Sequence, residues 1–184
     1  MRMSLSIVGV LATVLSVGIV GAQTTPAQPA SPASSSATVL NATEAQKIFP
    51  ASVFFKGQTA PIQGRNSGGV RLPDKKFVLF SLVDNSGYSS QVQERYQAYL
   101  ITEATLDIDG HKLVPGAYGC GFLAENSFVV MDLSGRDLFL AHSKHDADMR
   151  RPVPLQIEAT ANEPGLYRLY AGRNFVTFRV AAGD

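Results

Sequence analysis

Residues 98–108 alternate between apolar and polar side chains, and this alternation constrains the fold more than any other feature of the sequence. The even positions are apolar apart from Thr102, and they are Ala98, Leu100, Ala104, Leu106 and Ile108. A period of two is typical of a β-strand that buries one face. Asp109-Gly110 follows, and both residues tolerate the positive φ angles of a type I′ turn. The sequence therefore predicts a β-hairpin at this point.

The pattern continues to Leu133, and we expect residues 99–133 to form one continuous antiparallel meander. After the hairpin come a return strand at Leu113-Val114, a turn at Pro115-Gly116, an apolar run over residues 117–123, a turn at residues 125–127 and a strand over residues 128–133. Apolar runs separated by such turns favour pairing between consecutive strands.

The rest of the chain adds short strands and few helical signals. Residues 76–83 are apolar on both faces, which predicts a central strand covered on both sides. Further strands are expected at residues 53–55, 137–141, 153–159, 166–171 and 175–180, a loop at residues 61–69, a short helix at residues 44–48 capped by Thr43, and a helical turn before residue 98. We therefore predict an all-β fold, an antiparallel β-sandwich or partly open barrel built from hairpins, with at most one or two short helices.

Residues 1–37 have the composition of an export signal and a linker. Arg2, an apolar stretch from Leu5 to Val20 and the small residues Gly21-Ala22 predict a signal peptide over residues 1–22. The alternative is a membrane anchor, but spanning a bilayer takes about 20 predominantly apolar residues, and this shorter stretch is interrupted by serine and glycine. Residues 23–37 contain only Gln, Thr, Pro, Ala and Ser, which predicts a disordered tether. We expect one domain over residues 38–184, in a secreted or periplasmic protein without a transmembrane segment after cleavage.

Charge and cysteine content exclude several partners. The chain has 16 basic and 15 acidic residues, and removal of the signal peptide with Arg2 leaves 15 of each. A neutral domain lacks the clustered positive surface that nucleic acids require, so no nucleic-acid partner is expected. Cys120 is the only cysteine, so no intramolecular disulfide can form. No cofactor is expected.

Four segments in the second half of the chain have a familiar order and spacing. They are LVPGAYG at residues 113–119, FVVMD at residues 128–132, RPVPLQ at residues 151–156 and YRLYAGR at residues 167–173. Together they resemble a family of small exported bacterial all-β proteins of unassigned function, over residues 77–180. The resemblance implies an exported all-β domain and assigns no catalytic residue.

One loop carries the side chains of a metal site, namely His142, His145, Asp146 and Asp148. Imidazole and carboxylate are suitable zinc ligands, and a loop can fold them around one ion. The alternative is an exposed polar loop, because histidines three apart in a loop share no fixed face and the neighbouring Lys144 and Arg150 oppose a cation. We prefer the polar loop.

Cys120 is the only candidate nucleophile with a nearby histidine in the predicted meander. A reactive thiolate needs an imidazolium or a helix N-terminus beside it, and His111 lies on the neighbouring predicted strand. The alternative, which we prefer, is a buried and inert thiol between Gly119 and Gly121.

Tyrosine and arginine near the C-terminus offer a different kind of site. Tyr167, Arg168, Tyr170 and Arg173 combine rings that stack with groups that hydrogen-bond, as a ligand-binding surface requires. The prediction for function is an exported, non-enzymatic binding or interaction module of unknown ligand. The alternatives are a metal- or cysteine-dependent envelope enzyme and a structural envelope component that pairs through an exposed sheet edge.

Overall fold

The computed structural model describes residues 36–181 of the chain. The predicted signal peptide (residues 1–22) and, apart from its last two residues, the predicted tether (residues 23–37) lie outside this range. Two β-sheets pack together without closing into a barrel, and two short helices accompany them. The prediction of an all-β sandwich with at most one or two short helices is confirmed. Within the described range, no helix is long and apolar enough to span a membrane.

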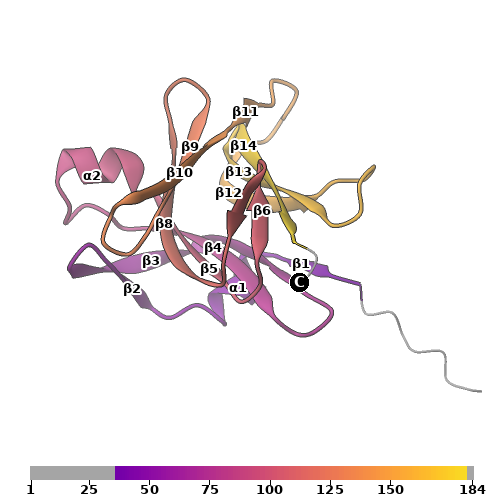
Figure 1. The fold of residues 1–184 in the computed structure, drawn as a ribbon, viewed down its shortest axis with the longest axis horizontal. Helices are drawn as coiled ribbons and strands as arrows, with labels where there is room; N and C mark the ends of the chain where they lie inside the picture. The colour runs from indigo at the N-terminus through magenta and orange to yellow at the C-terminus, as the bar shows by residue number, and fades with distance from the viewer. Residues whose placement is uncertain (1–35, 182–184) are drawn as a thin grey trace, which may run out of the picture. The chain divides into compact units, whose positions relative to one another are not determined.

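The first sheet contains eight strands, all paired antiparallel (Figure 1). In spatial order they are β1 (Thr38–Leu40), β3 (Gln58–Arg71), β4 (Phe77–Val83), β5 (Ala98–Thr102), β8 (Gly116–Leu123), β9 (Ser127–Met131) and β10 (Asp137–His142), while β2 (Ser52–Phe55) pairs with the other half of β3. The two outermost positions are therefore taken by short strands at one side and by β10 at the other.

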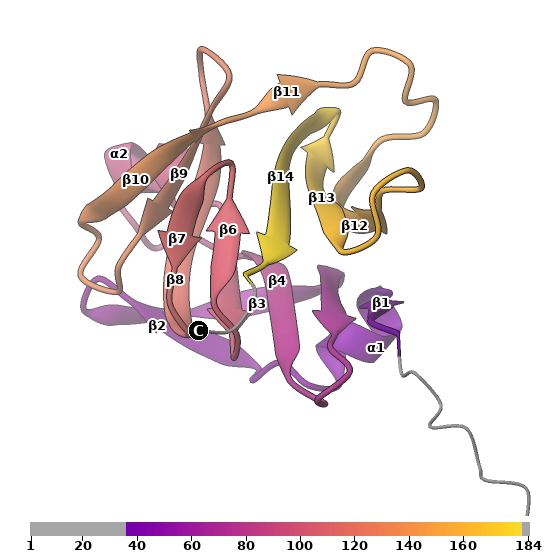
Figure 2. The same cartoon turned by 45° about the vertical axis from the view of Figure 1, so that its right-hand side comes forward.

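The second sheet contains six strands, also antiparallel. In spatial order they are β12 (Val153–Ala159), β13 (Leu166–Gly172), β14 (Asn174–Val180), β6 (Leu106–Ile108) and β7 (His111–Leu113), and β11 (Lys144–His145) pairs with the start of β14. Figure 2 shows how the chain leaves β10 and reaches β11 beside β14. The predicted final hairpin corresponds to β13 and β14.

The long alternating segment of residues 98–108 is shared between the two sheets. Its first part is β5 in the first sheet and its last part is β6 in the second. The even positions are buried throughout, as the alternation predicts. Thr102 lies at the bend, where its hydroxyl donates a 2.6 Å hydrogen bond to the Ala104 carbonyl and accepts one from the Ala104 amide. The one polar residue of the pattern therefore satisfies the backbone where the chain changes sheet.

The predicted continuous meander over residues 99–133 is therefore wrong in one respect. The hairpin formed by β6 and β7 belongs to the second sheet, and β5 pairs directly with β8. The hairpin turn itself has the predicted geometry, with φ of 50° at Asp109 and 86° at Gly110. The turn residues therefore predicted the hairpin correctly, but they gave no indication of which sheet the hairpin joins.

Two hydrophobic clusters lie on the two faces of the first sheet. The inner cluster fills the space between the sheets and includes Val78, Phe80, Leu100, Leu106, Leu169 and Phe178. The outer cluster lies on the opposite face, under α1 (Ala42–Gln46), α2 (Ser90–Arg95) and the β2–β3 hairpin, and includes Phe55, Leu79, Tyr88, Tyr96, Tyr99 and Val129. Strand β4 contributes to both clusters, so the predicted central strand is confirmed.

The predicted loop at residues 61–69 is wrong, because these residues form the middle of β3. The pairing of β3 with β4 shifts register between Ile62 and Ser67. This irregularity accommodates the glycine-rich sequence of the segment. At Gly69 a Cβ atom would lie 2.7 Å from the Val78 carbonyl oxygen. The glycine therefore permits close strand packing and does not mark a flexible loop.

The first helix begins two residues earlier than predicted. Asn41 caps it, and Asn41 and Glu44 form a reciprocal capping box through hydrogen bonds of 3.1 Å and 3.0 Å. Thr43, the predicted cap, lies inside the helix. The predicted helical turn before residue 98 corresponds to α2.

Candidate functional site

An apolar groove of about 550 Å³ lies where the chain passes from β5 to β6. Its lining is mostly apolar and comes from the β3–β4 turn, the β5–β6 bend, Pro115, Tyr167 and the end of β14. Pockets of this size and character are typical small-molecule sites when a few polar groups converge on them.

Backbone hydrogen bonds fix the walls of the groove. The Leu72 amide donates to the Lys76 carbonyl over 2.8 Å and closes the β3–β4 turn. The Ala181 amide donates to the Thr105 carbonyl over 2.9 Å and holds the end of β14 against the β5–β6 bend. Residues from distant parts of the sequence are thus held around one space.

Tyr167 is the predicted ligand-binding residue that lines this groove. Its ring is 5% exposed and stacks on Phe178 with centroids 5.3 Å apart. Burial raises the pKa of the Tyr167 hydroxyl above its ordinary value, so this group is neutral at physiological pH. The hydroxyl is not among the fully buried unpaired atoms of residues 36–181, so its oxygen keeps accessible surface at the groove and can reach a ligand there.

Charged groups form one rim of the groove. The Lys76 ammonium lies 2.8 Å from the Asp74 carboxylate, and this contact lowers the pKa of Asp74 and raises that of Lys76. Glu103 accepts a 2.8 Å hydrogen bond from the Phe77 amide. The charges lie at the solvent side, while the interior wall is formed by buried Leu72 and Ala104.

The structure separates the other three predicted ligand-binding residues from Tyr167. Arg168 and Tyr170 occupy the outer face of the second sheet, where Arg168 donates to the Tyr170 hydroxyl over 3.3 Å and its guanidinium lies 4.9 Å from the Phe175 ring centroid. Tyr170 is 1% exposed. Arg173 lies in the β13–β14 turn. These residues stabilise the outer face and do not form one surface with Tyr167.

Asp146 and His145 use their side chains in other contacts, whereas the contacts of His142 and Asp148 are made by their backbone amides. The Asp146 carboxylate accepts a 3.1 Å hydrogen bond from the Tyr170 hydroxyl, and His145 Nδ1 lies 2.8 Å from the Asn174 side-chain oxygen. The His142 amide donates to Asp109, and the Asp148 amide to Asp146. Within the range that the structure covers, no three His, Cys, Asp or Glu side chains are arranged to hold a metal ion.

Cys120 is completely buried, and burial raises the pKa of its thiol to about 12. Its sulfur lies 3.6 Å from the Ala98 carbonyl oxygen. His111 is in β7 of the second sheet, where its ring stacks on Phe139 at 4.7 Å. The prediction that Cys120 and His111 lie on neighbouring strands is therefore wrong, and His111 does not activate the thiol.

Comparisons with protein-family models, with curated proteins and with solved structures gave no match. The resemblance to a family of exported all-β proteins stays a prediction.

Proposed function

We propose that the protein is an exported, non-enzymatic β-sandwich that binds a small apolar ligand in the groove beside Tyr167. The observation that carries this proposal is the largely buried Tyr167 on the wall of an apolar groove of about 550 Å³, with a hydroxyl that is not among the fully buried unpaired atoms of residues 36–181. The export signal predicted for residues 1–22 supports its place outside the cytoplasm.

The chemistry of the groove defines the ligand class. Leu72, Ala104 and Val180 offer apolar surface, so the body of the ligand is aliphatic or aromatic. The Tyr167 hydroxyl contributes one directional hydrogen bond to a polar atom of that ligand. Asp74 and Lys76 pair with each other at the solvent side, and the apolar interior wall favours an uncharged ligand body.

The test uses N-phenyl-1-naphthylamine, a neutral apolar amine whose fluorescence rises in apolar surroundings. Thr105→Trp places a large ring in the groove and should weaken binding at least about tenfold. The matched control is Thr177→Trp, since Thr177 is equally half-buried and lies in β14. The chain contains no tryptophan, so the emission of each new ring also reports whether the variant is folded.

Tyr167→Phe tests the hydroxyl alone and should weaken binding about threefold, the usual effect of one neutral hydrogen bond. A wild-type protein that does not bind the dye would refute the groove as an apolar site. Equal loss in Thr105→Trp and Thr177→Trp would also refute it, because the effect would then not come from the groove.

A further inference from the structure

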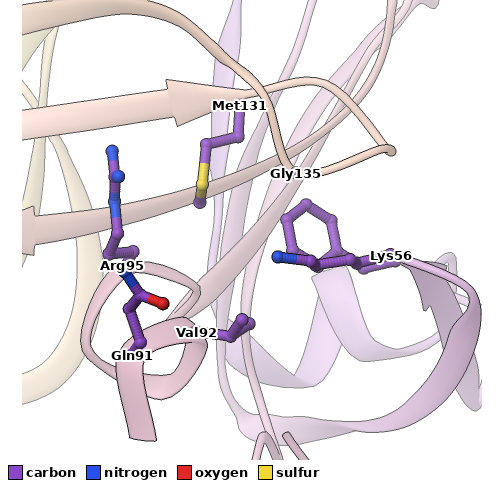
Figure 3. A pocket seen from close by; sticks show the side chains of 7 residues that line it. Lys56, Gln91, Val92, Arg95, Met131 and Gly135 are labelled. Carbon is purple, nitrogen blue, oxygen red and sulfur yellow. The ribbon is translucent and has the colours of Figure 1, made fainter. Parts of the chain in front are cut away.

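We propose a second, independent binding site, a small pocket that takes the carboxylate group of a ligand. The pocket has a volume of about 110 Å³ and lies between α2, the β2–β3 turn and the β9–β10 turn (Figure 3). Its polar side chains are Lys56, Gln91 and Arg95. None of these residues lines the apolar groove.

Lys56 is held at the pocket by an unusual backbone position. Lys56 and Gly57 are the central residues of the two-residue β2–β3 turn, with φ of 48° and 85°. Asparagine, aspartate and glycine are the usual residues where φ is positive, so a lysine here is locally unfavourable. Its side chain lies over Gly135, where a Cβ atom would be 3.1 Å from the Lys56 Cδ. Figure 3 shows its amine extending into the pocket.

Arg95 provides the second cation at the end of α2. Its Nη2 atom lies 2.5 Å from one Asp137 carboxylate oxygen. Its Nε atom is buried and has no hydrogen-bond partner in residues 36–181. A buried donor without an acceptor is unfavourable, so the guanidinium gains a hydrogen bond if it turns to present this atom to an anion in the pocket. The pairing with Asp137 orients the guanidinium and leaves this donor unused.

Charge and size favour a carboxylate over a larger anion. Lys56 and Arg95 together with Asp137 give the site one net positive charge, which matches a monoanion. A volume of about 110 Å³ corresponds to about four water molecules, enough for a carboxylate and a short aliphatic stem. Phe55, Val92 and Met131 line the pocket and offer apolar contacts to that stem.

The experiment is an NMR titration of the full-length protein with butanoate, observed at the methionine methyl groups. Met131 lines the pocket, whereas Met149 lies elsewhere, near Gln156, and serves as an internal control. We expect a saturable shift of the Met131 methyl signal with a dissociation constant in the millimolar range and no shift at Met149. Inorganic phosphate, the second probe, should shift Met131 at least about fivefold more weakly.

Variants assign the effect to the pocket. Lys56→Gln should weaken butanoate binding about fivefold or more, because it removes a charged donor. Lys75→Gln is the matched control, since Lys75 also has a positive φ, 69°, in the turn between β3 and β4. The absence of a saturable Met131 shift would refute the site. Equal responses to phosphate, or equal losses in both lysine variants, would refute its assignment to a carboxylate at Lys56.

Discussion

The two faces of the first sheet are packed in different ways. On the inner face, side chains of both sheets interdigitate, and Val78, Phe80 and Leu100 are each at most 1% exposed. On the outer face, no second sheet is present in residues 36–181, and large rings such as Phe55 and Tyr96 lie close to the strands instead. The difference shows that a sheet can be covered on one face by a second sheet and on the other by helices and a hairpin. Each kind of cover requires side chains of a different size on the face beneath it.

Strand β8 displays this contrast within three residues. Cys120 points into the inner cluster. Gly119 and Gly121 face the outer side, where a Cβ atom would overlap the Phe55 ring and the Arg95 carbonyl, respectively. The outer cover therefore approaches the sheet backbone so closely that only glycine fits. On the inner face, the Cys120 side chain fits among the residues of the inner cluster.

The largest effect is expected on the inner face. Leu100→Ala should reduce the free energy of unfolding by about 3 kcal/mol, because it leaves a cavity between two sheets that cannot collapse independently. Leu140→Ala is the control, since Leu140 is 53% exposed on β10 and should change stability by less than about 1 kcal/mol. Urea unfolding measures the free energy of unfolding of both variants. Equal losses would contradict the distinction between the buried inner face and the exposed edge strand.

A smaller loss is expected where the outer cover touches the sheet. Gly119→Ala should cost about 1–3 kcal/mol, because the new methyl group displaces the Phe55 ring. Adding Phe55→Leu should recover part of this loss, which a double-mutant cycle measures as a coupling energy. Gly87→Ala is the control, because no atom lies within 4 Å of the position that its new methyl group would occupy. Additive effects of Gly119→Ala and Phe55→Leu would contradict direct contact.

Alternation predicted which side chains are buried but not which sheet they join. The even residues of 98–108 face the space between the two sheets, and that space is common to both. A strand can therefore cross from one sheet to the other without any change in its period. Thr102 was the only local sign of the crossing, because a polar group inside a buried face needs a partner such as the Ala104 carbonyl.

Composition was misleading at residues 61–69, where proline and glycine suggested a loop. Pro61 lies in β3 opposite Ser52, and Gly69 is required by the close approach of β4. Both residues have a structural role that depends on neighbouring strands, and these neighbours are distant in sequence. Turn residues alone therefore do not distinguish a loop from an irregular strand.

The candidate sites were only partly predictable for the same reason. Tyr167 was predicted to bind a ligand, but the other walls of its groove come from turns near residues 74, 104 and 115. The small pocket combines Lys56, Arg95 and Gly135, which no local motif connects. One signal was available, since a lysine before Gly57 is unusual in a two-residue hairpin turn.

The smallest effect, with the opposite sign, is expected in the outer cluster. Tyr96 is completely buried, its ring stacks on Phe55 at 3.9 Å, and its hydroxyl has no partner in residues 36–181. Tyr96→Phe removes an unsatisfied polar group and should raise the free energy of unfolding by up to about 1 kcal/mol. Tyr88→Phe is the matched control and should lower it by a similar amount, because the Tyr88 hydroxyl donates a 2.8 Å hydrogen bond to the Phe55 carbonyl.

The pH dependence of this pair sharpens the comparison of the two faces. Burial raises the pKa of Tyr96 above its ordinary value of 10.0, so the unfolded chain loses this proton first. The ionisation of Tyr96 therefore leaves the free energy of unfolding unchanged below pH 10 and reduces it as the pH rises beyond that value. The advantage of Tyr96→Phe over the wild type in urea unfolding should therefore grow above pH 10. A constant difference across that range would show that the Tyr96 hydroxyl reaches water in the folded protein, and the outer cover would then be looser than the inner one.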